Sequence, residues 1–207
     1  MNNPLFLCGP ACCGTNLVKA ILGVHPEINL ESEPYLPLFR SLRNAIVSRS
    51  NNFVFQSFDP KSPFNEYYFF DERLAIMDLI QSSDLDIEFN PQERNQLKAA
   101  IADRCHYVPH LIQHLDALKG ANYKELFKSA LNILLLASNN KDVKWNGWLD
   151  SWIEEFFPLL AREFPKARFV LIFRDPRAAI ASYKRSFSKI ESTLEPLTLS
   201  YLRCWRK

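Results

Sequence analysis

The chain has 207 residues, of which 47% are hydrophobic and 23% are charged, so wholesale disorder is excluded and one packed domain, or one domain with a helical appendage, is expected. The net charge of +2 excludes a generally polycationic nucleic-acid binder. The charges are unevenly spread, because residues 162–207 hold 11 Lys or Arg against 4 Asp or Glu. An anionic ligand is therefore expected to bind through the C-terminal part of the sequence.

The N-terminal segment predicts a strand, a glycine loop and a helix. Residues 4–8 form a short apolar run that is typical of a buried parallel strand. Gly9 to Gly14 follow as a tight loop, and a helix is expected from Thr15 until His25-Pro26 stops it. The apolar face expected for this helix consists of Leu17, Val18, Ile21 and Leu22.

The middle of the chain is expected to be mainly helical. A helix is predicted after Pro37, and the aromatic residues 53–70 are predicted to form an irregular segment on the substrate side. Asn90-Pro91 supplies an N-cap and a first-turn proline for another helix. Helices are expected over residues 71–81, 91–105, 109–118 and 123–137.

The C-terminal part alternates strands and helices again. Strands are predicted at 142–147 and 168–173, of which the second is the clearest buried strand, and Ser151 is predicted to cap the helix between them. A further helix is expected with Pro176 in its first turn. The alternation at both ends predicts a single α/β domain over 1–207: a P-loop NTPase-like, three-layer α/β/α fold with a central parallel sheet and a helical insertion at about 35–140.

The loop from Gly9 to Gly14 has the G-x-x-x-x-G spacing of a phosphate-binding loop between a strand and a helix. Backbone N–H groups of such a loop converge on an anion, and the helix dipole favours negative charge there. Thr15 stands where nucleoside triphosphatases carry a Lys, which disfavours a nucleotide kinase or ATP hydrolysis. Taken alone, the loop is also compatible with a plain tight turn of an α/β sheet.

A second basic motif follows the predicted strand 168–173. Arg174 stands at the carboxyl end of this strand, where open α/β sheets bind ligands, and Ser182 lies eight residues later on the following helix. Arg supplies a bidentate fork for a phosphate and Ser one hydroxyl donor. The alternative is a helix N-terminus with a weak surface pair between Asp175 and Arg177.

Together the two motifs resemble those of sulfotransferases. Residues 6–25, with Gly9, Gly14-Thr15 and the closing His25-Pro26, are similar to the family's 5′-phosphosulfate loop, and residues 166–182 are similar to its 3′-phosphate segment. The resemblance covers roughly residues 4–36 and 142–207 and says little about the middle of the chain. Family members commonly continue past this point with a loop over the nucleotide, so a C-terminally truncated or divergent member is expected.

The resemblance implies a sulfotransferase that uses 3′-phosphoadenosine 5′-phosphosulfate (PAPS) and moves a sulfuryl group to a hydroxyl or amine of a small-molecule or glycan acceptor. It implies that the 3′-phosphate is held by Arg174 and Ser182, and that no metal is needed, because fixed donors stabilise the leaving phosphate. The 5′-phosphosulfate would be held by Gly9, Cys13, Gly14, Thr15 and Asn16.

One catalytic position departs from the family. The loop of sulfotransferases carries a Lys or Arg two residues before the Gly of Gly-Thr, and Cys12 occupies that position here. Loss of this cation would cost ~10²–10³ in rate unless Lys144, Arg177 or Lys184 replaces it. A catalytically impaired relative that binds a nucleotide or another anion is therefore the alternative function.

A second catalytic residue is expected after the first helix, where Glu33-Pro34 resembles a Glu-Pro pair of bacterial-type members. Glu33 is the favoured general base that takes the acceptor's proton, and the alternative is a solvated loop carboxylate.

The remaining features define the expected surroundings. His106, His110 and His114 repeat every four residues, but Pro109 interrupts the helix that would align them, so a metal site is disfavoured. No apolar run reaches the ~20 residues of a membrane span, no signal peptide is recognised, and no nucleic-acid partner is expected. A reduced, cytoplasmic chain is expected from the odd set of cysteines: Cys8, Cys12, Cys13, Cys105 and Cys204.

Overall fold

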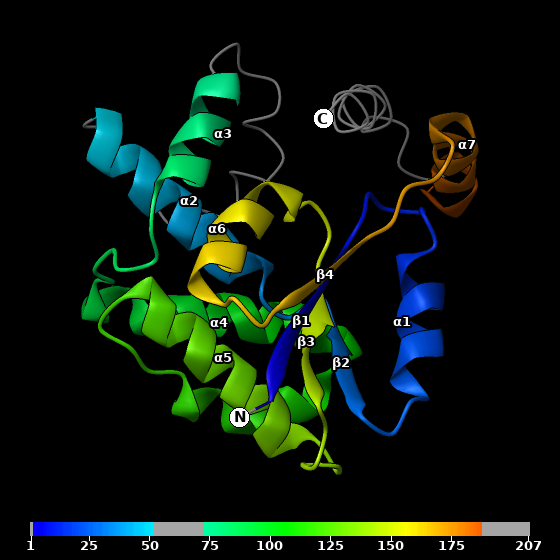
Figure 1. Ribbon diagram of the computed structural model, residues 1–207, viewed down its shortest axis with the longest axis horizontal. Helices are drawn as coiled ribbons and strands as arrows, with labels where there is room; N and C mark the ends of the chain where they lie inside the picture. The colour runs from blue at the N-terminus through cyan, green and yellow to red at the C-terminus, as the bar shows by residue number, and fades with distance from the viewer. Residues whose placement is uncertain (1, 52–72, 188–207) are drawn as a thin grey trace.

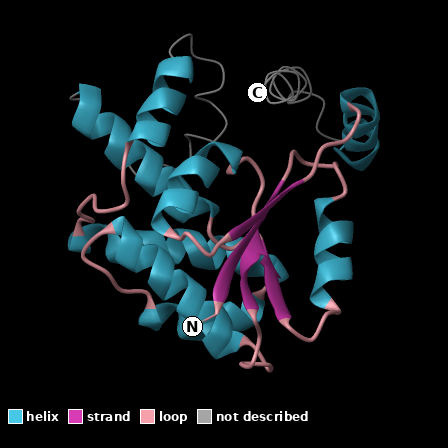
Figure 2. Cartoon of the chain, viewed as in Figure 1, coloured by secondary structure: helices cyan, strands magenta, loops and turns pink. Residues whose placement is uncertain are grey.

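The computed structural model describes residues 2–51 and 73–187, and its centre is a parallel sheet (Figure 2). Four strands pair in the order β2-β3-β1-β4, and all three pairings are parallel. The strands are β1 (Asn3–Cys8), β2 (Ile28–Ser32), β3 (Trp145–Leu149) and β4 (Arg168–Leu171). The predicted α/β class is confirmed, and the strand, glycine loop and helix at the N-terminus form a P-loop-like unit.

Helices connect the strands and cover both faces of the sheet (Figure 1). The helices α2 to α5 all fall between β2 and β3, and short 3₁₀ turns join several of them. Their bounds are α1 (Thr15–Gly23), α2 (Leu36–Asn51), α3 (Arg73–Ser82), α4 (Arg94–Arg104), α5 (Tyr123–Ala137), α6 (Phe157–Glu163) and α7 (Pro176–Phe187).

Alternation along β1 builds two hydrophobic clusters, one on each face of the sheet. Leu5 and Leu7 point toward α1 and pack with partly buried residues of that helix, such as Leu22. Phe6 points the other way, into the larger cluster formed with the helices between β2 and β3. There its ring meets Trp148 of β3 edge-on, with centroids 4.9 Å apart. These clusters hold the strands in place and therefore determine where the loops at the carboxyl edge lie.

The register brings the carboxyl ends of the strands level. Ser32 pairs with Leu149 and Leu149 pairs with Leu7, so the chain leaves β2, β3 and β1 at neighbouring positions. The connection from β1 runs toward β2, whereas the connection from β3 passes β1 to reach β4. Connections that diverge in this way mark the carboxyl edge as the place where open α/β sheets bind ligands.

Several local predictions were wrong. Strand β2 was not predicted, because its Asn29 and Glu31 interrupt the apolar pattern. Strand β3 lies a few residues later than 142–147. Ser151 does not cap a helix: it lies in a turn, and α6 begins only at Phe157, where Pro158 suits the first turn.

Three further elements also differ from the prediction, two in their burial and one in its helix type. Strand β4 is an edge strand with exposed or half-buried residues rather than the most buried strand. The segment 109–117 is a 3₁₀ helix. On α1, Leu17 is 65% exposed and Ile21 is 60% exposed, so only the side that carries Val18 and Leu22 packs on the sheet.

Two predicted features fall on residues that the structure does not describe. The aromatic segment 53–70 lies outside the described residues, as does Cys204. Within residues 2–51 and 73–187, no helix is both long and apolar enough to cross a membrane.

Candidate functional site

The glycine loop between β1 and α1 has two glycines, and each is required for a different reason. A Cβ on Gly9 would lie 2.7 Å from the carbonyl oxygen of Ile172 and 2.9 Å from Cγ2 of Thr15, so only glycine allows this close approach. Gly14 has a φ of +94° and open space around it, so glycine serves the backbone conformation there. As the N-cap of α1, Gly14 has no side chain to cover the first N–H groups of the helix.

Those N–H groups face the carboxyl edge of the sheet, where an anion can accept hydrogen bonds from them. Thr15 is buried against the loop, whereas Asn16 is exposed. Cys12 is half-buried and has a positive φ of 59°, which belongs to the same tight turn. The loop is thus shaped by its backbone, and its geometry fits a phosphate or sulfate group.

Arg174 joins the second predicted motif to this loop. Its Nη1 donates a hydrogen bond of 2.9 Å to the carbonyl oxygen of Cys12. The contact follows from the topology, since β4 pairs directly with β1 and Ile172 N continues the ladder by donating to Cys8 O. The rest of the Arg174 guanidinium is exposed at the carboxyl edge.

Helix α7 packs against the other side of the loop. Ala179 of α7 and Cys13 of the loop are buried together in a small cluster. Ser182 comes one helical turn after Ala179 and is half-buried, on the side of α7 that faces the loop. Burial raises the pKa of the Cys13 thiol, against an opposing effect of Arg174, so this residue is a neutral thiol. The two sequence motifs therefore meet in space.

The three cations expected to replace the missing loop cation are placed differently. Lys144 precedes β3, and its carbonyl oxygen accepts a hydrogen bond from Asn3 N, so it lies at the amino edge, away from the loop. Arg177 forms a 2.6 Å ion pair with Asp175, and this contact lowers the pKa of Asp175 to about 2. Lys184 is exposed on α7, two residues beyond Ser182. Of the three, Lys144 is ruled out by its position.

Glu33 lies at the same edge of the sheet, across β3 from the loop. It directly follows β2, two strands away from β1, which corresponds to about 10 Å across the sheet. Its Oε2 accepts a 3.3 Å hydrogen bond from Nη2 of Arg104, and its Oε1 accepts a 3.4 Å hydrogen bond from the Ser151 hydroxyl. Arg104 Nε also donates to the backbone carbonyl of Glu33, at 3.3 Å. Glu33 is therefore a held carboxylate rather than a freely solvated one.

Asp150, which was not predicted as a site residue, directly follows β3 and lies close to Glu33. Its side chain is fully buried, and its Oδ2 accepts a 3.1 Å hydrogen bond from Tyr35 N. Burial is the main cause that raises its pKa to about 8, and the Arg104 charge opposes that rise. A buried carboxyl group at the carboxyl end of a parallel strand is a signal for a site. It was missed because the strand was placed too early, at 142–147.

Cys8, the last residue of β1, was assigned no role and is buried under the loop. Its thiol donates to Oε2 of Glu154 at 3.4 Å, and its sulfur accepts from Ile153 N at 3.4 Å. Burial and the neighbouring Glu154 raise the pKa of this thiol well above its ordinary value. Cys8 is thus an inert structural thiol that ties β1 to the turn after β3.

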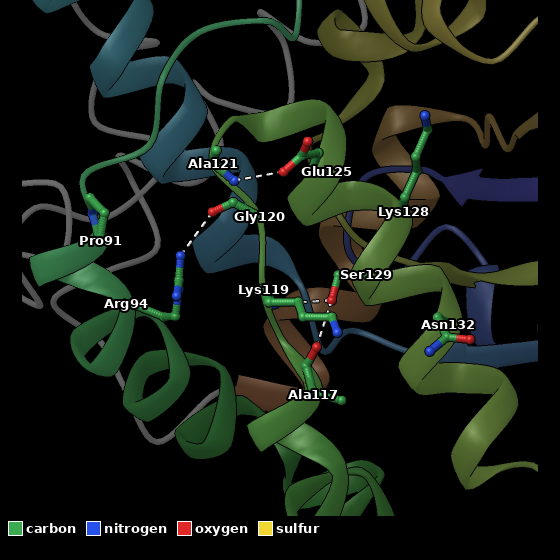
Figure 3. Close-up of a pocket in the computed structure, with 10 residues that line it drawn as sticks. All are labelled: Pro91, Arg94, Ala117, Lys119, Gly120, Ala121, Glu125, Lys128, Ser129 and Asn132. Atoms are coloured by element: carbon green, nitrogen blue, oxygen red, sulfur yellow. Dashed lines mark hydrogen bonds between the residues drawn. The ribbon is translucent and has the colours of Figure 1, made fainter.

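An open pocket of about 740 Å³ lies elsewhere, between the amino ends of α4 and α5 (Figure 3). Its Arg94 donates to the Gly120 carbonyl at 2.8 Å, and its Glu125 accepts from Ala121 N at 2.7 Å. Arg94 and Arg104 stand at opposite ends of α4, about 15 Å apart. The pocket therefore contains none of the predicted site residues and does not belong to the carboxyl edge.

The histidine series does not form a metal site in the part of the chain that is described. His110 Nε2 lies 3.2 Å from Oε1 of Glu31, and the rings of His106 and Tyr107 pack together. No group of three potential ligands is gathered among the described residues.

Comparison with known proteins connects this edge to a family. The family model described as "Sulfotransferase family" matches residues 4–207, which includes the glycine loop, Arg174 and the whole insertion between them. No curated protein matches the chain.

Proposed function

The chain belongs to the sulfotransferase family, and we propose that it transfers a sulfuryl group from PAPS to a hydroxyl or amine of a small-molecule or glycan acceptor. Family membership supports sulfuryl transfer in general. The observation that carries it is the hydrogen bond between Arg174 and the Cys12 carbonyl, because it unites the two phosphate motifs at one edge of the sheet.

The donor's two anionic ends would bind on either side of this contact. The N–H groups of Gly14, Thr15 and Asn16 at the start of α1 would hold the 5′-phosphosulfate, with Gly9 and Cys13 shaping the loop. The exposed face of the Arg174 guanidinium and the Ser182 hydroxyl would hold the 3′-phosphate. The excess of Lys and Arg in the last part of the sequence favours the same anion.

The chemical step would use Glu33 as general base. When bound, the donor supplies an electrophilic sulfur whose bond to the bridging phosphate oxygen breaks as the acceptor oxygen or nitrogen attacks. Glu33 would take the proton that the acceptor loses, and Arg104 and Ser151 hold its carboxylate in place. Charge that develops on the leaving phosphate would be stabilised by the loop N–H groups, while Cys12 supplies no fixed charge at the position of the usual cation.

A catalytically impaired binder of the same nucleotide is the second candidate, and Cys12 favours it. Its thiol replaces the Lys or Arg of the family, and Lys144 lies at the wrong edge to compensate. Such a protein would bind the donor but transfer nothing.

The proposed function is tested by measuring the release of 3′,5′-adenosine diphosphate from PAPS in the presence of each member of a panel of hydroxyl and amine acceptors. Chromatography quantifies the product. We expect acceptor-dependent release by the wild type, reduced ~10²-fold or more in Glu33→Gln and unchanged in the control Glu27→Gln, whose side chain is exposed in the turn before β2. Release that no acceptor stimulates, in the wild type and in Cys12→Arg alike, would contradict the proposed function.

A further inference from the structure

Asp150 is a buried carboxyl group with half of its hydrogen-bonding capacity unused. Oδ2 accepts from Tyr35 N, but no group in the described part of the chain donates a hydrogen bond to Oδ1, although the side chain is 0% exposed. A buried carboxyl oxygen without a hydrogen-bond donor lowers the stability of the folded state, because the desolvation of that oxygen is not compensated. Such a group at the carboxyl edge of the sheet calls for a functional explanation.

The unsatisfied oxygen lies near the Arg104 guanidinium. Nη2 of Arg104 is 4.0 Å from Oδ1 of Asp150, and the same nitrogen is 3.3 Å from Oε2 of Glu33. One guanidinium nitrogen therefore stands between two carboxyl groups, one buried and one at the site. Because the Glu33 backbone carbonyl accepts from Arg104 Nε, the guanidinium is fixed on the side of Glu33.

We infer that Asp150 is a positioning residue that controls how readily Glu33 accepts a proton. It does so because both carboxyl groups interact with the same Arg104 guanidinium. The inference rests on the proposed role of Glu33 as base. When Asp150 is neutral, Arg104 is bound to Glu33 alone, and a cation bound to a carboxylate opposes its protonation. When Asp150 is ionised, it shares Arg104, and Glu33 accepts the acceptor's proton more readily.

The surroundings of Asp150 place this change near neutral pH. Among residues 2–51 and 73–187, the ionisable groups that interact with it besides Arg104 and Glu33 are Cys8 from β1, Tyr35 before α2 and Cys105 after α4. All three of these have raised pKa values and are neutral at pH 8, with Cys105 at about 11. Arg104 and Glu33 are therefore the charged groups that respond when Asp150 loses its proton at about pH 8.

The test follows the carboxyl carbons of Glu33 and Asp150 by carbon-13 NMR between pH 5 and 10, which needs no enzymatic turnover. We expect the Glu33 signal of the wild type to show a step near pH 8 that coincides with the titration of Asp150. The step should vanish in Asp150→Asn, whose amide oxygen still accepts from Tyr35 N, and persist in Asp103→Asn, an exposed neighbour on α4. In Arg104→Gln, Asp150 should titrate at higher pH, because the Arg104 charge lowers its pKa.

The rate profile supplies the second readout. In the wild type, kcat should rise roughly tenfold between pH 7 and 9, the usual scale of one neighbouring charge, with the donor KM unchanged. Asp150→Asn should lack the rise. A Glu33 signal without a step near pH 8, or a rise that survives in Asp150→Asn, would overturn the inference. A wild type that transfers nothing would contradict the proposed function, while the NMR titration would still decide whether Asp150 acts on Glu33.

Discussion

The guanidinium of Arg174 and the carbonyl oxygen of Cys12 are 162 residues apart in the sequence and form a 2.9 Å hydrogen bond. The bond exists because β4 lies directly beside β1, so the loops that leave these two strands share one edge. An anion held by the loop N–H groups would therefore lie beside a basic side chain from the far end of the chain.

The two loop glycines should respond differently to a methyl group. Gly9→Ala should destabilise the protein by about 1–3 kcal/mol, because its Cβ would meet a backbone oxygen at 2.7 Å. Gly14→Ala should cost ~1 kcal/mol through its positive φ alone. Gly23→Ala is the matched control: its Cβ meets nothing within 4 Å at the end of α1, so stability should stay equal or rise by up to about 1 kcal/mol. Urea denaturation measures all three, and equal losses would contradict the loop geometry.

Replacing Cys12 should separate a slow enzyme from a binder. In Cys12→Arg, the restored cation should raise kcat by ~10²-fold or more, since it would stabilise the leaving phosphate. Cys12→Ser, which adds no charge, is the control and should leave the rate near that of the wild type. Single-turnover assays distinguish the cases: absence of transfer in all three proteins, with donor binding retained, would identify a binder.

Asp150 should make stability depend on pH. Its pKa is raised from 3.8 in the unfolded chain to about 8 in the folded protein, so between these values the folded state binds the extra proton. Through this group, the free energy of unfolding therefore falls as pH rises from about 4 to 8, by up to ~1.4 kcal/mol per pH unit. Asp150→Asn should flatten this slope, whereas Asp103→Asn should keep it. Denaturation at pH 5, 6.5 and 8 measures the slope, and identical slopes in all three proteins would be inconsistent with a buried, titrating Asp150.

The outward face of α1 should tolerate change that the sheet beneath the helix does not. Leu17→Ala should alter stability by less than ~0.5 kcal/mol, because that side chain is 65% exposed. Leu30→Ala, in the cluster that α1 covers, should cost about 2–5 kcal/mol. Thermal unfolding compares the two, and a large loss in Leu17→Ala would show that this face is covered.

The glycine loop and the start of α7 were predictable from the sequence, because local patterns specify them. Gly9, Gly14 and Pro176 have requirements that depend on their own backbone, and the structure places all three at turns or helix starts. The pairing of the two motifs was also predictable, since Arg174 follows a strand and parallel strands end at one edge.

The surroundings of Glu33 were less predictable because they depend on contacts distant in sequence. Arg104 lies 71 residues from Glu33, and no local pattern marks it as a partner. The edge position of β4 and the outward turn of Leu17 depend on strand order and on which helices cover the sheet, and neither is encoded in a single window of residues. Asp150 carried a local signal, which was lost when its strand was placed too early.

Calorimetric titration with 3′,5′-adenosine diphosphate tests the proposed donor site itself, because it needs no acceptor. We expect the wild type to bind the bisphosphate more tightly than it binds ATP. We expect loss of that binding in Arg174→Ala and retention in Arg168→Ala, an exposed arginine at the other end of the same strand. Equal binding by Arg174→Ala and the wild type, or binding of ATP in preference to the bisphosphate, would contradict the proposed donor site.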